Sequence, residues 1–145
     1  MSSSPIPIAT YGKNSQITQG LRERLLPQYE MAHICVSYEA ALHEFPAVCA
    51  GDLETEQSSG LGSNAELPPA ERKVPRAVIL GGGVPEHEVQ AVRQAVLQAT
   101  VDKEQQPMVV HLTREDILAA GGQGPDPELI GRLLREKLAS LQETA

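Results

Sequence analysis

Residues 76–88 constrain the fold more than any other stretch of this 145-residue chain. Residues 77–80 are uninterrupted apolar residues, which is typical of a short strand that is covered on both faces. Residues 81–83 are all glycine, and the absence of a Cβ lets the backbone turn where side chains would clash. Pro85 suits the first position of a helix, because the N–H that it lacks has no partner there. The stretch therefore predicts a buried strand, a tight turn and a helix start.

The same alternation of strands and helices extends along the chain. Apolar runs predict strands at residues 6–11, 31–37, 77–80 and 107–112. Apolar residues at helical spacing predict helices at residues 15–26, 38–45, 85–99, 117–120 and 127–141. Asn14 or Ser15 is the expected N-cap of the first helix, and Asp126 is that of the last. Thr113 and Asp116 have the spacing of a capping box.

This order of elements predicts a three-layer α/β fold. Strands that alternate with helices form parallel sheets with helices on both faces, joined by right-handed crossovers. For four strands we expect the flavodoxin-like or Rossmann-like order 2-1-3-4, which places strands one and three in the middle. The second and fourth strands, which contain His33 and His111, then lie at the two edges of the sheet.

Chain length and local composition predict one domain with one flexible insertion. A chain of 145 residues fits a single domain, residues 1–145, that can bury a hydrophobic core. Residues 51–73 are rich in Gly, Ser, Glu, Asn and Pro and hold only isolated leucines. Such a composition has little apolar surface to bury, so we expect a mobile surface insertion between the second helix and the third strand.

The charge and the cysteines restrict the partners and the compartment that we expect. The net charge is −7, and aromatic residues make up 3% of the chain, so nucleic acid is not an expected partner. No apolar run approaches the ~20 residues of a membrane span, and the first residues do not resemble a signal peptide. Cys35 and Cys49 are predicted to be reduced and buried. We therefore expect a soluble protein of the cytoplasm or nucleus.

Residues 26–42 resemble the second strand and helix of response-regulator receiver domains, and the whole layout is similar to that family. Thr113 stands at the end of the fourth strand, where the family keeps a switch hydroxyl. The acidic pair after the family's first strand is replaced here by residues 11–13, and its phosphorylated Asp by residues 81–83. A fifth strand with its Lys is absent. The resemblance implies the topology, and it leaves open a receiver-like regulatory scaffold without a phosphorylation site.

Glycine-rich loops do not identify a cofactor. Dinucleotide-binding folds carry G-x-G-x-x-G after the first strand, whereas Gly12 stands alone there. Residues 81–85 contain glycines at a different spacing. Residues 12–15 lack the upstream glycine and the Lys-Ser/Thr pair of a phosphate loop. The cofactor is therefore unknown.

The sheet order nevertheless predicts where a ligand binds. In open parallel sheets, ligands bind beyond the carboxyl ends of the strands, where the strand order reverses, which here lies between strands one and three. Helix N-termini point N–H groups at this edge and favour a small anion such as a phosphate or carboxylate. The candidate ligand-binding residues are Lys13, Asn14, Ser15, Gly81, Gly82, Gly83, His87 and Thr113. The alternative is that they are ordinary turn and capping residues.

No set of residues predicts a particular reaction or metal. His87 could form an acid–base pair with Glu86 or Glu88, although a solvated helix start is the simpler interpretation. Neither His33 nor His111 has a cysteine or carboxylate at the spacing of a metal motif, so no metal site is predicted. We therefore assign no catalytic residue, and whether the protein is an enzyme stays open.

The uncovered edge of the fourth strand and the leucine-rich last helix suggest association of two copies. The alternative is that these leucines only cover the sheet. The sequence thus predicts a small α/β binding or interaction module that forms a homodimer. The alternatives are a nucleotide- or phosphate-binding protein or enzyme that uses the cleft of strands one and three, and the receiver-like scaffold.

Overall fold

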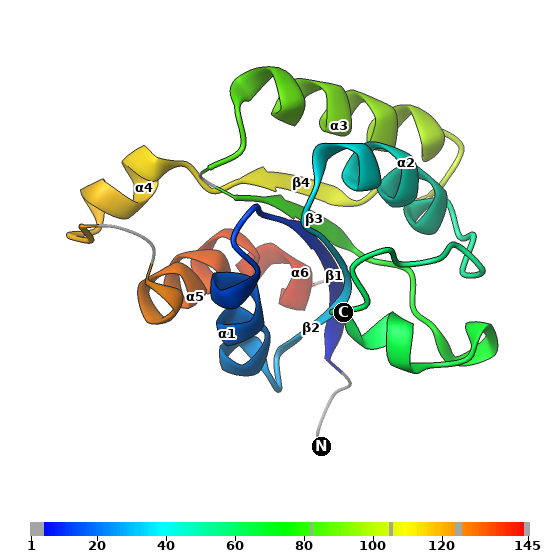
Figure 1. The fold of residues 1–145 in the computed structure, drawn as a ribbon, viewed down its shortest axis with the longest axis horizontal. Helices are drawn as coiled ribbons and strands as arrows, with labels where there is room; N and C mark the ends of the chain where they lie inside the picture. The colour runs from blue at the N-terminus through cyan, green and yellow to red at the C-terminus, as the bar shows by residue number, and fades with distance from the viewer. Residues whose placement is uncertain (1–4, 82, 105, 124–125, 144–145) are drawn as a thin grey trace.

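The predicted four-stranded parallel sheet is confirmed. The computed structural model describes residues 5–81, 83–104, 106–123 and 126–143. Its strands are β1 (Ile6–Tyr11), β2 (Tyr29–Cys35), β3 (Ala77–Leu80) and β4 (Met108–His111). All pairings are parallel, and the order is β2-β1-β3-β4 (Figure 1). The strand order therefore reverses between β1 and β3, as predicted.

Helices cover both faces of the sheet and give three layers (Figure 1). On one face, side chains of α1 (Ser15–Leu25), α4 (Arg114–Ala119), α5 (Pro127–Lys137) and α6 (Ala139–Glu143) pack against the sheet in one apolar core. On the other face, α2 (Tyr38–Cys49) and α3 (Glu86–Ala99) form the second core. Because side chains alternate along β1, Ile8 belongs to the first core and Ala9 to the second.

Most helix starts follow the predicted capping chemistry. The Asn14 side chain accepts hydrogen bonds from two N–H groups of α1, and Asp126 caps α5. Thr113 and Asp116 form the predicted capping box of α4. Pro85 was expected inside the helix, but its extended backbone makes it the N-cap of α3 instead.

Several element boundaries differ from the prediction, and α4, for example, begins at Arg114 rather than at residue 117. Helix α2 continues through Pro46 to Cys49 rather than ending near residue 45. Strand β2 begins at Tyr29 and ends before Ser37, because Ser37 is the N-cap of α2. The last helix is divided into α5 and α6 at Leu138, whose N–H still bonds back to α5.

Residues 51–73, here named the connecting segment, lie along the outer edge of β2. The segment contains two short 3₁₀ helices, η1 (Ser63–Glu66) and η2 (Pro69–Glu71). The Gln57 side chain accepts from the N–H of Ile34 at 2.9 Å and donates to the carbonyl of Ala32 at 3.2 Å, as a neighbouring strand would. The sequence did not predict these contacts. The mobility of the segment stays a prediction.

Burial of the last leucines removes one argument for a dimer. Leu134, Leu138 and Leu141 are buried against the first core, so they cover the sheet of their own chain. The homodimer stays a prediction, with the outer edge of β4 as its remaining surface. In the described ranges, no helix combines the length and the apolar character that crossing a bilayer requires.

Candidate functional site: a cavity at the carboxyl ends of β1 and β3

A cavity of about 430 Å³ opens at the point where the strand order reverses. We name it the carboxyl-edge cavity. Apolar side chains from α1, α4 and α5 and from the sheet make up most of its wall. Its lining residues are Thr10, Tyr11, Gly12, Lys13, Asn14, Ile17, Thr18, Leu21, Met31, Ile79, Gly81, Gly83, Leu112, Arg114, Ile117, Leu118, Gln123, Ile130 and Leu134.

Two glycines bring the turns after β1 and β3 close together. The N–H of Gly81 donates to the carbonyl of Tyr11 at 2.9 Å. A Cβ at Gly81 would lie 3.4 Å from that oxygen and 3.7 Å from the Cα of Gly12, which are ordinary contact distances, and a Cβ at Gly83 would meet no atom within 4 Å. The prediction that side chains would clash in this turn is therefore not borne out at Gly81 or Gly83.

Four of the predicted ligand-binding residues line the cavity: Lys13, Asn14, Gly81 and Gly83. Three others do not: Ser15 is exposed at the start of α1, His87 lies against Tyr38, and Thr113 caps α4. Gly82 lies outside the described residues.

Side chains already cap two helix N-termini at this edge, those of α1 and α4, whereas the N-terminus of α3 has no side-chain cap. The Asn14 side-chain oxygen accepts from the N–H groups of Gln16 and Ile17 at 3.1 and 3.2 Å. The Thr113 hydroxyl accepts from the N–H of Asp116 at 3.0 Å. Because these donors have partners, the N-termini of α1 and α4 offer an anion fewer N–H groups than the sequence suggested.

Lys13 is also engaged. Its ammonium lies 3.7 Å from a carboxylate oxygen of Glu88, the other oxygen of which accepts from the Tyr11 hydroxyl at 2.8 Å. Burial of the phenol, reinforced by the bond to Glu88, raises the pKa of Tyr11 well above its usual value. Tyr11, Glu88 and Lys13 thus form a closed polar cluster on the α3 side of the sheet.

Thr10, next to Tyr11 in the chain, faces the opposite side. Its side chain lines the cavity and is 6% exposed. Its hydroxyl oxygen is buried and has no hydrogen-bond partner in the part of the chain that the structure describes. A buried hydroxyl without a partner is costly, so this group is a candidate contact for a ligand.

Arg114 supplies an exposed cation at the same cavity. Neither an ion pair nor a hydrogen bond engages its guanidinium among the described residues. Sequence analysis missed both Thr10 and Arg114. The signal for Thr10 was its position two residues after Ile8, which places it on the same face of β1. Arg114 is the first residue of α4, and the sequence pattern there indicated only the capping box of Thr113 and Asp116.

His87 and Glu86 are exposed at the start of α3, which agrees with the simpler interpretation of a solvated helix start rather than with an acid–base pair. The His87 ring is exposed and lies edge-on to Tyr38, with ring centroids 6.5 Å apart. Glu88 pairs with Lys13, and Glu86 lies 3.9 Å from Nδ1 of His111. Nε2 of His111 is buried without a hydrogen-bond partner in the described chain.

A second polar cluster is buried between β2 and α2. His33 Nε2 lies 2.7 Å from Oε1 of Glu44, and the Cys35 thiol lies 3.5 Å from the same oxygen. Burial lowers the pKa of His33, although Glu44 acts in the opposite direction, and burial raises the pKa of Cys35 strongly. The prediction that His33 has no cysteine or carboxylate at ligand spacing is therefore wrong. Cys35 follows His33 by two residues on β2, and residues two apart on a strand share a face. This spacing was the overlooked signal for Cys35.

The cysteines are free and buried, as predicted. Burial raises the pKa of Cys49 to about 12, so this thiol is not an activated nucleophile.

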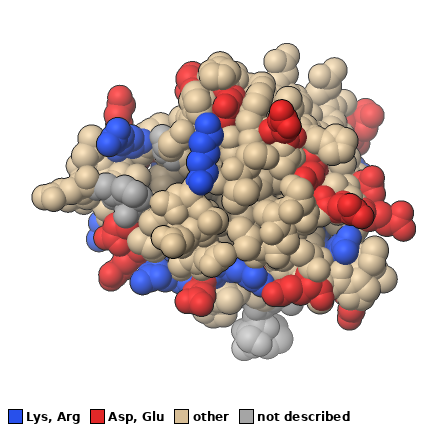
Figure 2. All heavy atoms as spheres, in the orientation of Figure 1, with Lys and Arg blue, Asp and Glu red and all other residues tan. Residues whose placement is uncertain are grey.

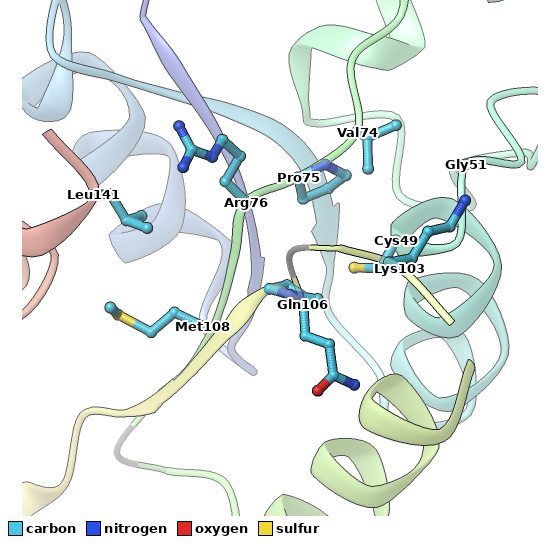
Figure 3. Close-up of a pocket in the computed structure, with 10 residues that line it drawn as sticks. Cys49, Gly51, Val74, Pro75, Arg76, Lys103, Gln106, Met108 and Leu141 are labelled. Carbon is cyan, nitrogen blue, oxygen red and sulfur yellow. The ribbon is translucent and has the colours of Figure 1, made fainter. Parts of the chain in front are cut away.

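Another hollow, of about 550 Å³, lies at the opposite edge of the sheet, where β3 and β4 begin (Figure 3). Arg76 and Lys103 line it, with Cys49, Met108 and Leu141 among its apolar residues.

On the face shown in Figure 2, Lys and Arg are separated from one another by acidic and neutral residues. The charges on that face therefore do not form one continuous basic patch.

Comparison with known proteins gives one partial similarity. The chain is 33% identical over 90 residues to "Kojic acid related protein 6" of Aspergillus oryzae, a match that covers 62% of this chain. The chain spans about half the length of this curated relative. No protein-family model matches the chain, and no solved structure does. These comparisons therefore do not place the chain in a family.

Proposed function

We propose that this chain is a binding module for a small, largely apolar molecule that carries one polar or anionic group. The observation that supports this most is the buried, unpartnered hydroxyl of Thr10 at the wall of a cavity of about 430 Å³. Ligand pockets commonly have volumes of about 300–1,000 Å³ and combine an apolar wall with a few polar groups. The apolar body would lie against α1 and α5, and the polar group would reach Thr10 or Arg114.

The composition of the wall favours binding over acid–base catalysis. The titratable residues in the wall of the carboxyl-edge cavity, within the described part of the chain, are Tyr11, Lys13 and Arg114, and the side chain of Tyr11 lies on the α3 side of the sheet. Tyr11 has a raised pKa and donates to Glu88, so it is poorly suited to give or take a proton near neutral pH. The N–H groups at the N-termini of α1 and α4 already bond to side-chain caps, and this also favours a mostly apolar ligand over a phosphate.

A thermal-shift screen tests this proposal. The panel contains kojic acid, chosen because of the relative's name, together with small ring carboxylates, nucleotides and inorganic phosphate. A ligand at about 100 times its dissociation constant stabilises the folded state by roughly 2.7 kcal/mol, which gives a clear shift in melting temperature. We expect a shift with an apolar ring compound that bears an acceptor or a carboxylate.

Matched variants assign that shift to the cavity. Arg114→Ala and Thr10→Val should each reduce it, because each removes a contact to the polar group. Lys103→Ala, an exposed cation at the opposite hollow, should leave it unchanged. A panel without any shift, or a shift that only Lys103→Ala removes, would contradict the proposal.

A further inference from the structure

The cluster of His33, Cys35 and Glu44 is separate from the carboxyl-edge cavity and has its own chemistry. One ligand atom from each residue lies within 4.8 Å of those of the other two, and all three residues are buried. A nitrogen, a sulfur and a carboxylate oxygen therefore converge inside the core between β2 and α2. We propose that these three side chains bind a Zn²⁺ ion and that the connecting segment closes over it.

The fold holds the donors in place without the ion. His33 and Cys35 are two residues apart on β2, so both project toward α2, where Glu44 faces them. The ring of Phe45 lies edge-on to the imidazole of His33, with centroids 5.8 Å apart, and restricts its rotation. A small movement apart of Nε2 and the carboxylate oxygen would make room for a metal between them, because these atoms now lie at hydrogen-bond distance.

The donor set selects the class of metal. Zn²⁺ takes Cys sulfur, His nitrogen and Glu oxygen, whereas Mg²⁺ and Ca²⁺ prefer oxygen donors alone. Three protein donors leave the fourth tetrahedral position for a water or for the hydroxyl of Ser58. That hydroxyl already lies 2.7 Å from the other oxygen of Glu44, Oε2.

The connecting segment supplies both the cover and the route. Ser58 is exposed, although Glu44 beneath it is buried. Gln57 and Ser59 hold this part of the segment to β2 through their side chains, the Ser59 hydroxyl donating to the carbonyl of Ile34 at 2.5 Å. These side-chain bonds can open while the pairing of β2 with β1 stays intact, and the ion can then enter.

A hydrogen-bonded network without metal is the competing explanation. In that arrangement Glu44 accepts from His33, Cys35 and the hydroxyl and N–H of Ser58, at 2.7–3.5 Å. The two explanations differ in one observable, which is whether the Cys35 sulfur becomes a metal-bound thiolate.

The first experiment uses the full chain, freed of metal with a chelator and kept reduced. It is titrated with Co²⁺, a spectroscopic substitute for Zn²⁺, and with Zn²⁺ in competition with a chromophoric chelator. We expect one ion per chain and a thiolate-to-cobalt charge-transfer band. X-ray absorption of the Zn²⁺ form should show one sulfur at about 2.3 Å, with nitrogen or oxygen as the other ligands. The proposal would be overturned if Zn²⁺ did not bind with one ion per chain, or if X-ray absorption showed no sulfur or two sulfurs bound to the zinc. This test uses the unchanged chain and needs no substitution.

Variants then assign the ligands. Cys35→Ser should remove the band and weaken Zn²⁺ binding more than roughly 100-fold, beyond the ~10–100-fold loss seen when a residue only supports a ligand. Cys49→Ser, which removes the other buried thiol, is the matched control and should keep both. Ser58→Ala should keep the band, because a water can take the fourth position, and should accelerate metal uptake, because the hydrogen bond that holds the cover to Glu44 is lost. A band that persists in Cys35→Ser, or that disappears in Cys49→Ser, would refute the assignment.

Discussion

Near the carboxyl ends of β1 and β2, buried polar groups on one face of the sheet are paired within the chain, whereas a buried hydroxyl on the other face is not. On the α2 and α3 face, the Tyr11 hydroxyl donates to Glu88, and His33 and Cys35 meet Glu44. On the α1 and α5 face, the Thr10 hydroxyl meets a cavity and no partner in the described chain. Away from these strand ends each face has a group of the other kind: Nε2 of His111, on the edge strand β4, has no partner among the described residues, and the buried Tyr29 hydroxyl on the α1 and α5 face donates to the carbonyl of Leu138 at 3.1 Å. Polar groups that are paired within the chain are explained by folding, whereas an unpaired group beside a cavity points to a ligand.

The largest expected effect is the loss of Glu44. Glu44→Leu, measured in chelator, removes the common acceptor of His33, Cys35 and Ser58 and leaves buried donors unpaired. Such a loss lowers the free energy of unfolding by about 3–5 kcal/mol, which urea denaturation would measure. Glu39→Leu, on the exposed face of the same helix, is the control and should stay within about 0.5 kcal/mol. A Glu44→Leu protein as stable as this control would show that the cluster does not contribute to the free energy of unfolding.

Tyr11→Phe should have the next largest effect. It removes a buried hydrogen bond to a carboxylate and should lower the free energy of unfolding by about 1.5–3 kcal/mol. Tyr38→Phe is the matched control, because the Tyr38 hydroxyl makes no hydrogen bond within the described residues. Equal stability of the two variants would contradict the pairing of Tyr11 with Glu88.

Lys13→Met should have a smaller effect. The Lys13 side chain is 51% exposed, and its ammonium lies 3.7 Å from Glu88. Partly exposed pairs contribute about 0–1 kcal/mol and are screened by salt, so the change in unfolding free energy should shrink as salt is added. A loss that exceeds that of Tyr11→Phe would mean that Lys13, rather than the phenol, holds Glu88 in place.

The smallest expected effect concerns the capped end of α4 and its pH dependence. The N–H of Thr113 donates to Asp116 and, with Lys137 nearby, holds the pKa of Asp116 below its usual value. A lowered folded-state pKa stabilises the protein above the unfolded pKa, and this contribution disappears as pH falls through the folded pKa. Asp116→Asn should therefore cost less than about 1 kcal/mol near neutral pH. In urea titrations the difference from the unchanged protein should vanish in acid, and a constant difference would contradict the capping account.

The fold could be predicted because its signals are local and periodic. The apolar run at residues 77–80, the glycine turn and the capping box each act within a few residues of chain, and they place the elements. The strand order then followed from the general rules for alternating strands and helices. Helix α2 passed through Pro46 because packing of Phe45 and Val48 in the second core continues beyond the proline. Such tertiary packing overrides a local helix-ending signal.

The site was harder to predict because its residues act through space. The position of the cavity followed from topology alone, but its apolar wall comes from α1, α4 and α5, whose spacing indicated only core. The engagement of Lys13 by Glu88 depends on residues 75 positions apart in the sequence. The contacts of the connecting segment with β2 use polar side chains in place of apolar burial, so its composition gave no sign of them.

Adjacent substitutions on β1 test whether the Thr10 hydroxyl is unpaired because its partner is a ligand. Thr10→Val and Tyr11→Phe each remove one buried hydroxyl, from opposite faces of the same strand, and urea denaturation compares their free energies of unfolding. We predict opposite signs: Tyr11→Phe destabilises the protein, whereas Thr10→Val stabilises it by about 1 kcal/mol and weakens binding of any ligand found in the screen. A Thr10→Val protein that is destabilised as much as Tyr11→Phe would show that the Thr10 hydroxyl already has a partner in the folded chain, and would contradict the account.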